Sequence, residues 1–135
     1  MDEETHLRRH GLHPAGPRLD EVRAVLAEQT RLERGAQGDG DTELMKLCCV
    51  QLFNAGDPRD TPLVWAAKTA SMDAGCSIET RLLCGAGLPE TRAYLTAHPS
   101  PASEATLTHL RERAADFGAF TPRLVTAQYR AYYAD

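Results

Sequence analysis

The sequence has no long run of apolar residues. No stretch reaches the roughly 18 consecutive apolar residues that a membrane-spanning helix needs. Residues 1–18 also lack the apolar segment of a secretion signal. We therefore expect a cytoplasmic protein that has no membrane partner and is not secreted by the standard route.

The sequence also has few positively charged residues. The chain has 15 lysine and arginine residues against 19 aspartate and glutamate residues, a formal net charge of −4. Because nucleic-acid binding requires a basic surface, we expect no nucleic-acid partner. Most of the basic residues are arginine and alanine is abundant, which is typical of a GC-rich, bacterial genome.

The familiar signatures of enzymes and metal proteins are missing. The sequence contains no G-x-S-x-G motif, phosphate-binding loop, dinucleotide fingerprint, H-E-x-x-H motif or C-x₂-C pair. We therefore expect no cofactor and no bound metal. Whether the protein is an enzyme stays open, because catalytic groups also assemble from distant parts of a chain.

The sequence does have helical periodicity. With 135 residues, 42% of them hydrophobic, it has the size and composition of one globular domain. Apolar residues recur at helical intervals, and no sustained strand-like alternation occurs. We expect a flexible arm over residues 1–18, where no periodicity is visible, and a single all-α domain over residues 19–135.

Glycines and prolines divide this domain into about six or seven helices. Glycine-rich segments end helices, and the Thr-Pro pairs at residues 61–62 and 121–122 begin new ones, with the threonine as cap. Segment 43–53 is apolar nearly all round, so we expect it to be a buried helix. We expect a third helix from residue 61 to about residue 72, and a short fourth helix capped by Ser77.

Residues 61–67, Thr-Pro-Leu-Val-Trp-Ala-Ala, resemble the T-P-L-H-x-A start of an ankyrin repeat. Residues 52–58 and 83–89 match at leucine, alanine, glycine and proline, with an offset close to the ankyrin period of about 33 residues. The resemblance is best over residues 48–97. It implies a short, ankyrin-like solenoid of antiparallel helical hairpins, and the alternative is a compact, irregular helical bundle.

A solenoid of this kind binds proteins through its turn tips and first helices. The resemblance therefore implies a protein-interaction module that binds another protein or forms a homo-oligomer. The alternative is that the tryptophan of residues 61–67 fills the core and that the turn charges are only solvated. The implied binding residues are Asp57, Arg59, Asp60, Trp65 and Lys68.

A second hypothesis places a small-molecule ligand or an active site in a pocket between the third, fourth and fifth helices, lined by residues 68–81. Cys76 precedes the expected helix start at Ser77, where the helix dipole would favour a reactive thiolate. Lys68 follows an apolar run, so its charge must be exposed or paired. The alternative is a solvated connection with salt bridges. The candidate catalytic residues are Cys76, Asp73 and Lys68, with Arg81 as a further binding residue.

The remaining cysteines, Cys48, Cys49 and Cys84, are expected to be reduced and to fill the core. Cys48 and Cys49 are adjacent on a helix, so their side chains diverge by about 100° and are poorly placed to hold one ion. The cysteine pattern does not resemble a secreted disulfide framework.

Three histidines near the N-terminus, His6, His10 and His13, have the spacing i, i+4 and i+7. On a helix this spacing would align three imidazoles that could hold a divalent metal. Gly11 and Pro14 argue against that helix, so we expect a disordered arm without a metal site.

Tyrosines are concentrated at the other end of the chain. One side of the last helix can hold Tyr129, Tyr132 and Tyr133. Tyr132 lies three residues and Tyr133 four residues after Tyr129, and residues at these spacings are neighbours on a helix surface. Such a surface either docks the last helix on the core or contacts another chain. These tyrosines complete the set of candidate binding residues.

Overall fold

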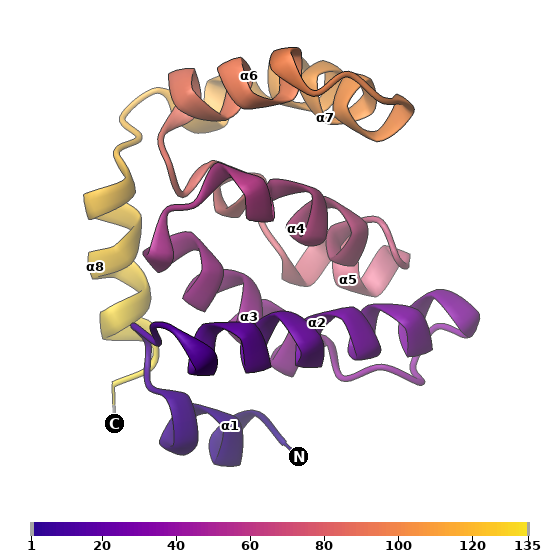
Figure 1. Ribbon diagram of the computed structural model, residues 1–135, viewed down its shortest axis with the longest axis vertical. Helices are drawn as coiled ribbons and strands as arrows, with labels where there is room; N and C mark the ends of the chain where they lie inside the picture. Colours follow the sequence, from indigo (N-terminus) through magenta and orange to yellow (C-terminus); the bar gives the residue numbers. More distant parts are fainter. Residues whose placement is uncertain (1, 135) are drawn as a thin grey trace.

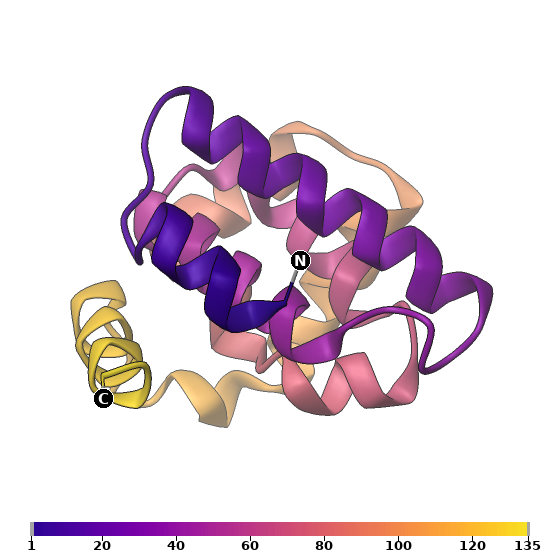
Figure 2. The same ribbon diagram turned by 90° about the horizontal axis from the view of Figure 1, so that it is seen from below.

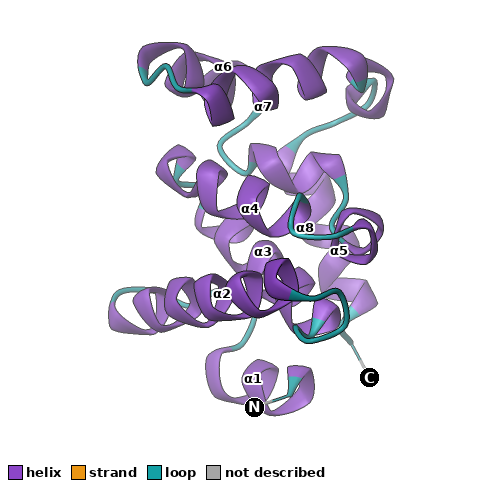
Figure 3. Ribbon diagram, turned by 90° about the vertical axis from the view of Figure 1, so that its right-hand side faces the viewer, coloured by secondary structure: helices purple, strands orange, loops and turns teal. Residues whose placement is uncertain are grey.

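The computed structural model describes residues 2–134, which form eight α-helices, three short 3₁₀ helices and no strand (Figures 1 and 3). The all-α class expected from the sequence is confirmed. No helix within residues 2–134 is long and apolar enough to cross a membrane. The α-helices are α1 (Glu3–His10), α2 (Pro17–Gly35), α3 (Thr42–Ala55), α4 (Thr61–Lys68), α5 (Met72–Ser77), α6 (Leu88–Ala97), α7 (Pro101–Glu112) and α8 (Pro122–Tyr132), and the 3₁₀ helices are η1 (Pro58–Asp60), η2 (Thr80–Cys84) and η3 (Ala114–Phe117).

The helices lie in stacked layers. α6 and α7 pair in the top layer of Figure 1, α4 and α5 lie with η2 in the middle, and α2 pairs with α3 below them. α1 lies under α3, and α8 runs along one side of the stack and packs against α3. Seen from below, α1 and α2 lie side by side (Figure 2). α3 therefore has neighbours on several sides.

The burial of α3 confirms the central helix expected from its all-round apolar sequence. The helix contacts α1, α2, α5, η2 and α8. Its buried residues form the largest share of a core that also receives Leu26 from α2, Val64 from α4, Leu83 from η2 and Val125 from α8. The buried residues of α3 itself run without a gap from residue 47 to residue 53.

Helix ends follow the expected glycine and proline signals. Asp41 caps α3 by accepting a hydrogen bond from the Leu44 N–H at 3.1 Å, and Gly56 ends α3 in the left-handed conformation, with φ 72°. Thr121 caps α8, whose first residue is Pro122. Local capping chemistry therefore determines where these helices begin and end.

Thr61 departs from its expected role as a cap. It is the first residue of α4, and its hydroxyl donates a hydrogen bond to the Leu83 carbonyl oxygen at 3.0 Å, which joins α4 to η2. η1 turns directly into α4, so Asp60 occupies the cap position without a side-chain capping bond. The expectation that Thr61 caps this helix is therefore wrong.

The segment between α4 and η2 also differs from expectation. α4 ends at Lys68, and Ser71 starts a separate helix, α5, by accepting a hydrogen bond from the Ala74 N–H at 3.0 Å. Ser77 ends α5 and does not cap the following turn. The error arose because Ser71 and Ser77 are both good cap residues.

The expected flexible arm holds a helix instead. Asp2 caps α1 by accepting a hydrogen bond from the Thr5 N–H at 2.8 Å, and acidic residues in its first turn and basic residues in its last complement the helix dipole. Gly11, with φ 66°, follows the last residue of α1 and therefore does not interrupt it. His6 is buried against α3.

A buried carboxylate organises the glycine-rich loop between α2 and α3. Glu33 accepts hydrogen bonds from the backbone N–H groups of Gly38 (2.9 Å) and Gly40 (3.1 Å) and from the Ser71 hydroxyl (2.5 Å). The bonds from Ser71 and from the two backbone groups lower the pKa of Glu33 despite its burial. Gly40 has no room for a side chain, since a Cβ there would lie 2.7 Å from the Gln29 carbonyl oxygen.

Candidate functional site

The turn that leads into α4 carries the exposed charges expected at a turn tip. The Asp57 carboxylate accepts hydrogen bonds from the Arg59 backbone N–H (3.0 Å) and from its guanidinium (2.8 Å). The hydrogen bond from the guanidinium is the main reason why the pKa of Asp57 is lowered. The Arg59 side chain is 77% exposed, so it is open to other molecules.

Asp60, in contrast, is buried and has a structural role. Its buried carboxylate receives two hydrogen bonds from Arg23 on α2, at 2.8 and 3.0 Å, and Arg23 also pairs with Asp20 at 2.8 Å. The hydrogen bonds to Asp60 raise the pKa of Arg23. This bidentate pair ties α2 to the turn before α4.

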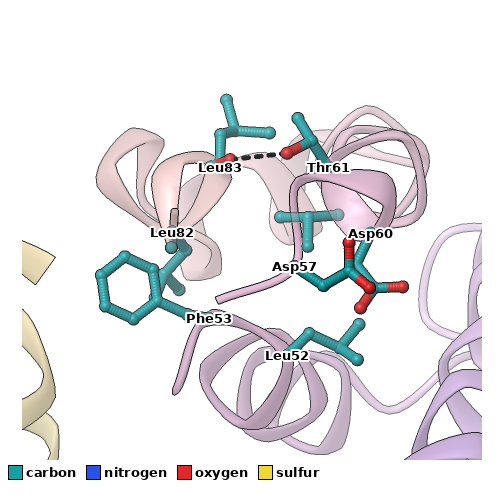
Figure 4. A pocket seen from close by; sticks show the side chains of 9 residues that line it. Leu52, Phe53, Asp57, Asp60, Thr61, Leu82 and Leu83 are labelled. Atoms are coloured by element: carbon teal, nitrogen blue, oxygen red, sulfur yellow. Dashed lines mark hydrogen bonds between the residues drawn. The ribbon is translucent and has the colours of Figure 1, made fainter. Parts of the chain in front are cut away.

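The same turn borders two spaces of different size. An open hollow of about 280 Å³ lies among Arg23, Asp57, Arg59 and Asp60. Asp57 and Asp60 also line a cavity of about 10 Å³, with room for about one water molecule and none for an organic ligand. Figure 4 shows Asp57 and Asp60 on one side of this cavity and Phe53 on the other.

Trp65 lies at the contact between α4 and α7. Its ring is 5.3 Å from the His109 ring, centre to centre, and His109 Nε2 lies 2.9 Å from the Thr80 hydroxyl oxygen. Burial is the main cause of the lowered pKa of His109. The structure therefore places Trp65 half-buried beside a neighbouring helix.

Lys68 meets the sequence expectation that its charge is exposed or paired. Its Nζ donates hydrogen bonds to the carbonyl oxygens of Gly75 (2.9 Å) and Ile78 (2.5 Å), at the end of α5. A cation is favourable there because the carbonyl end of a helix is partly negative. Burial lowers the pKa of Lys68, and the two hydrogen bonds indicate a structural role for it.

Cys76 does not lie at a helix N-terminus. It is exposed in the last turn of α5, so the helix start on which its expected activation rested is absent there. Asp73 lies in the first turn of the same helix and is exposed. The other thiols are buried as expected, and burial raises the pKa of Cys48 to about 12 and that of Cys84 to about 11.

Residues 68–81 do not line any of five hollows found within residues 2–134. These hollows are bordered by other residues. Arg81 instead pairs with Glu79 at 2.5 Å and donates to Gln128 on α8 at 3.0 Å. The pocket expected between the third, fourth and fifth helices is not one of these five hollows, and it stays a prediction.

Glu79 joins η2 to the last helix. Its carboxylate accepts hydrogen bonds from Arg81 and from the Tyr129 hydroxyl. Burial alone would raise the pKa of Glu79, but these hydrogen bonds outweigh burial and lower it. Burial raises the pKa of Tyr129, and the bond to Glu79 adds to that shift. Tyr129 therefore docks α8 on the core.

The three tyrosines do share one side of the chain end, as expected. Their ring centres are 4.8 to 6.3 Å apart. Tyr129 is buried, Tyr133 is half-buried, and Tyr132 is 57% exposed and receives a hydrogen bond from Lys46 at 3.0 Å. One of the three is thus available to another chain.

The N-terminal histidines are not arranged as a metal site. His6 and His10 lie on α1 and face the core, whereas Gly11 separates His13 from that helix. Within residues 2–134, no group of three or more histidine, cysteine, aspartate or glutamate side chains is placed to hold a metal ion.

Two adjoining hollows form a groove along α2 that the sequence analysis missed. Both are bordered by Ala24 and Val25, on the outer side of α2. The hollow toward α1 measures about 440 Å³ and the one toward α3 about 290 Å³. We call this surface the α2 groove; the residues that line it are Arg9, His10, Glu21, Ala24, Val25, Glu28, Gln29 and Leu44.

No protein-family model, curated protein or solved structure matches this chain. The resemblance to ankyrin repeats rests on the residues of the chain itself. Gly56 and Gly87, which occupy matching positions in residues 52–58 and 83–89, both have positive φ, at 72° and 94°, but their ψ values differ, at 21° and 156°.

Proposed function

We propose that the protein is a small helical interaction module that binds a short amphipathic helix of a partner protein in the α2 groove. The observation that carries this proposal is the pair of adjoining hollows along α2, with Ala24, Val25 and Leu44 as their apolar lining. Helix-in-groove binding uses this kind of surface, with apolar anchors from one face of the incoming helix.

The dimensions of the groove suit a helix of a few turns. The lining residues on α2 run from Glu21 to Gln29, which is about 12 Å or two helical turns. Ala24 is exposed at the middle of this length, and its small side chain lets another backbone approach closely. Two apolar side chains one or two turns apart on the partner would fill the two hollows.

The rim of the groove favours a partner with polar flanks of both signs. Glu21 is paired with Arg9 at 3.4 Å, and Glu28 is paired with Arg31 at 2.5 Å. All four side chains are about half exposed or more, and exposed ion pairs of this kind contribute little to folding. They can therefore exchange partners with charges on the incoming helix.

We also propose that residues 48–97 are a degenerate pair of ankyrin-like repeats. The positive φ at both Gly56 and Gly87 supports this, and so does the close contact of the two copies, since a Cβ at Gly85 would lie 2.5 Å from the Phe53 carbonyl oxygen. In the central copy, α5 and η2 stand in place of one continuous second helix. An ankyrin-like origin is consistent with a role in protein binding.

A second candidate function is self-association through α8. Leu124 is 41% exposed and Tyr132 is 57% exposed, and large apolar side chains at this exposure are few in residues 2–134. The double variant Leu124→Ser, Tyr132→Ser distinguishes this candidate by light scattering. A concentration-dependent dimer of the unmodified chain that the double variant loses would support it.

The groove is tested by selecting binders from a displayed library of helical peptides. Ala24→Arg fills the groove with a charged side chain, and Ala93→Arg is the matched control at an exposed alanine of α6. We expect Ala24→Arg to weaken the selected peptides at least about tenfold, or about 1.4 kcal/mol, and Ala93→Arg to leave them unchanged. Selected peptides that tolerate Ala24→Arg, or a library without binders, would contradict the proposal.

A further inference from the structure

A buried histidine pair joins α1 to α3. His6 and His10 lie one helical turn apart on α1, and their ring centres are 4.6 Å apart. Gln51 on α3 donates its side-chain N–H to the Gly11 carbonyl oxygen at 2.7 Å, so its Oε1 faces His6 Nε2 at 2.8 Å. Because this Oε1 can only accept, His6 carries its proton on Nε2.

The other ring nitrogen of each histidine has no hydrogen-bond partner. His6 Nδ1 and His10 Nδ1 are both buried, and within residues 2–134 neither meets a donor or an acceptor. A second proton on either ring would create a buried, charged N–H without an acceptor at Nδ1. Such a group is costly in a folded protein, so the packed state of α1 requires neutral rings.

The surrounding charges do not compensate for that cost. Burial is the main cause of the lowered pKa of both histidines. Glu21 on α2 lies 3.5 Å from His10 Nε2 and opposes the shift, but it is half exposed and already paired with Arg9. The charged or titratable groups near the pair are Arg9 on α1, Arg18 and Glu21 on α2, and Cys48 on α3, whose Sγ is 3.7 Å from His6 Nε2. Tyr133, which follows α8, lies close enough to α1 to be influenced by the charge of Glu3.

Gly11, at the end of α1, can act as a hinge, since it has a φ of 66° and open space where a Cβ would lie. The connection that follows stays on the core, because Asn54 donates a hydrogen bond to the Leu12 carbonyl oxygen at 2.8 Å and Pro14 is buried. α1 is also the outermost helix of the stack and packs mainly against α3. It can therefore leave without disturbing the contacts among the other helices.

We infer that α1 is an acid-released latch: protonation of His6 and His10 detaches it from α3 while the remaining helices stay packed. The released state binds more protons than the docked state, because each folded-state pKa lies below the unperturbed value of 6.5. Docking is therefore fully favoured above pH 6.5 and weakens as the pH falls below that value. Release also removes Arg9 and His10 from the α2 groove, a consequence that rests on the proposed function.

Amide hydrogen exchange at pH 7.5 and pH 5.0, corrected for intrinsic rates, tests the latch without any partner. We expect α1 amides to lose about tenfold protection for each unit of pKa shift, while α3 amides keep theirs. The variant His6→Gln, His10→Gln should lose this pH dependence, and His98→Gln, which alters an exposed histidine, should retain it. Unchanged α1 protection at pH 5.0, joint loss of protection in α1 and α3, or the same pH dependence in the double variant would overturn the inference.

A nuclear magnetic resonance titration of the histidine ring protons in the unmodified chain provides a reading that does not depend on variants. His6 and His10 are expected to titrate below the unperturbed value of 6.5, together with the change in α1 amide signals. Titration of both rings at or above 6.5, or α1 signals that stay unchanged as the rings titrate, would overturn the inference. Neither experiment depends on the α2 groove, so the latch and the proposed function succeed or fail separately.

Discussion

The Ser71 hydroxyl donates a hydrogen bond to the Glu33 carboxylate at 2.5 Å, and this contact joins the last turn of α2 to the start of α5. Ser71 also caps α5, while the other oxygen of Glu33 holds the loop that leads into α3. One carboxylate thus links three segments that are distant in the sequence. Its contribution to stability is directly testable.

Replacing this carboxylate is expected to destabilise the fold. In Glu33→Gln, part of the acceptor capacity for Ser71, Gly38 and Gly40 is lost, so the midpoint of urea unfolding at pH 7 should fall clearly. Because the pKa of Glu33 is lowered, the contribution of the carboxylate is present above about pH 4.5 and is lost as the pH falls further. The exposed control Glu28→Gln should shift the midpoint less, and an equal shift would contradict the prediction.

The ion pair between Arg23 and Asp60 should stabilise the fold because the Asp60 carboxylate is buried. Arg23→Ala leaves the Asp60 carboxylate buried and uncompensated, which is expected to cost about 3 kcal/mol of unfolding free energy. Arg59→Ala, at the exposed end of the same turn, should leave the unfolding free energy nearly unchanged. Chemical denaturation measures both, and similar effects of the two variants would show that Asp60 is not held as described.

Gly85 is expected to be intolerant of even one methyl group. A Cβ there would lie 2.5 Å from the Phe53 carbonyl oxygen, so Gly85→Ala must separate η2 from α3 at a cost of about 3 kcal/mol or more. Gly118 has a similar helical φ, and its Cβ would meet nothing closer than 3.6 Å. The unfolding temperature of Gly118→Ala should therefore be at or above that of the unmodified chain. An equal fall in the unfolding temperatures of Gly85→Ala and Gly118→Ala would contradict the close packing at Gly85.

Thiol labelling should distinguish Cys76 from the other cysteines. In the folded chain at neutral pH, one thiol should react with iodoacetamide, and Cys76→Ser should abolish that reaction. Because Cys76 lies in the last turn of α5, its rate should not exceed that of free cysteine. A rate well above that of free cysteine would restore the hypothesis of an activated nucleophile.

The parts of the fold that local chemistry determines could be predicted from the sequence. The all-round apolar pattern of segment 43–53 identified α3, and its ends follow from Asp41 and Gly56. Where two local signals competed, prediction was wrong: Ser71 and Ser77 are equally good caps, and only the packing of α5 selects the first. The signals for α1 were also present in Asp2 and the residues after it, but Gly11 and Pro14 obscured them.

The candidate site could be predicted only in part. The sequence indicated that Lys68 must be exposed or paired, and that Tyr129 either docks the last helix or contacts another chain. The groups that these two residues bond come from other elements and could not be predicted. Arg23 and Asp60 are 37 residues apart, and nothing in their local sequence pairs them. The α2 groove depends on how α1 and α3 flank α2, so its residues carry no common sequence pattern.

The central claim, that the α2 groove receives a partner helix, is tested most directly by backbone amide chemical shifts during titration with a selected helical peptide. We expect the largest changes on Ala24, Val25, Gln29 and Leu44, with smaller changes in α1. Changes confined to the turn at residues 57–60 or to α8 would contradict it and place the binding surface elsewhere.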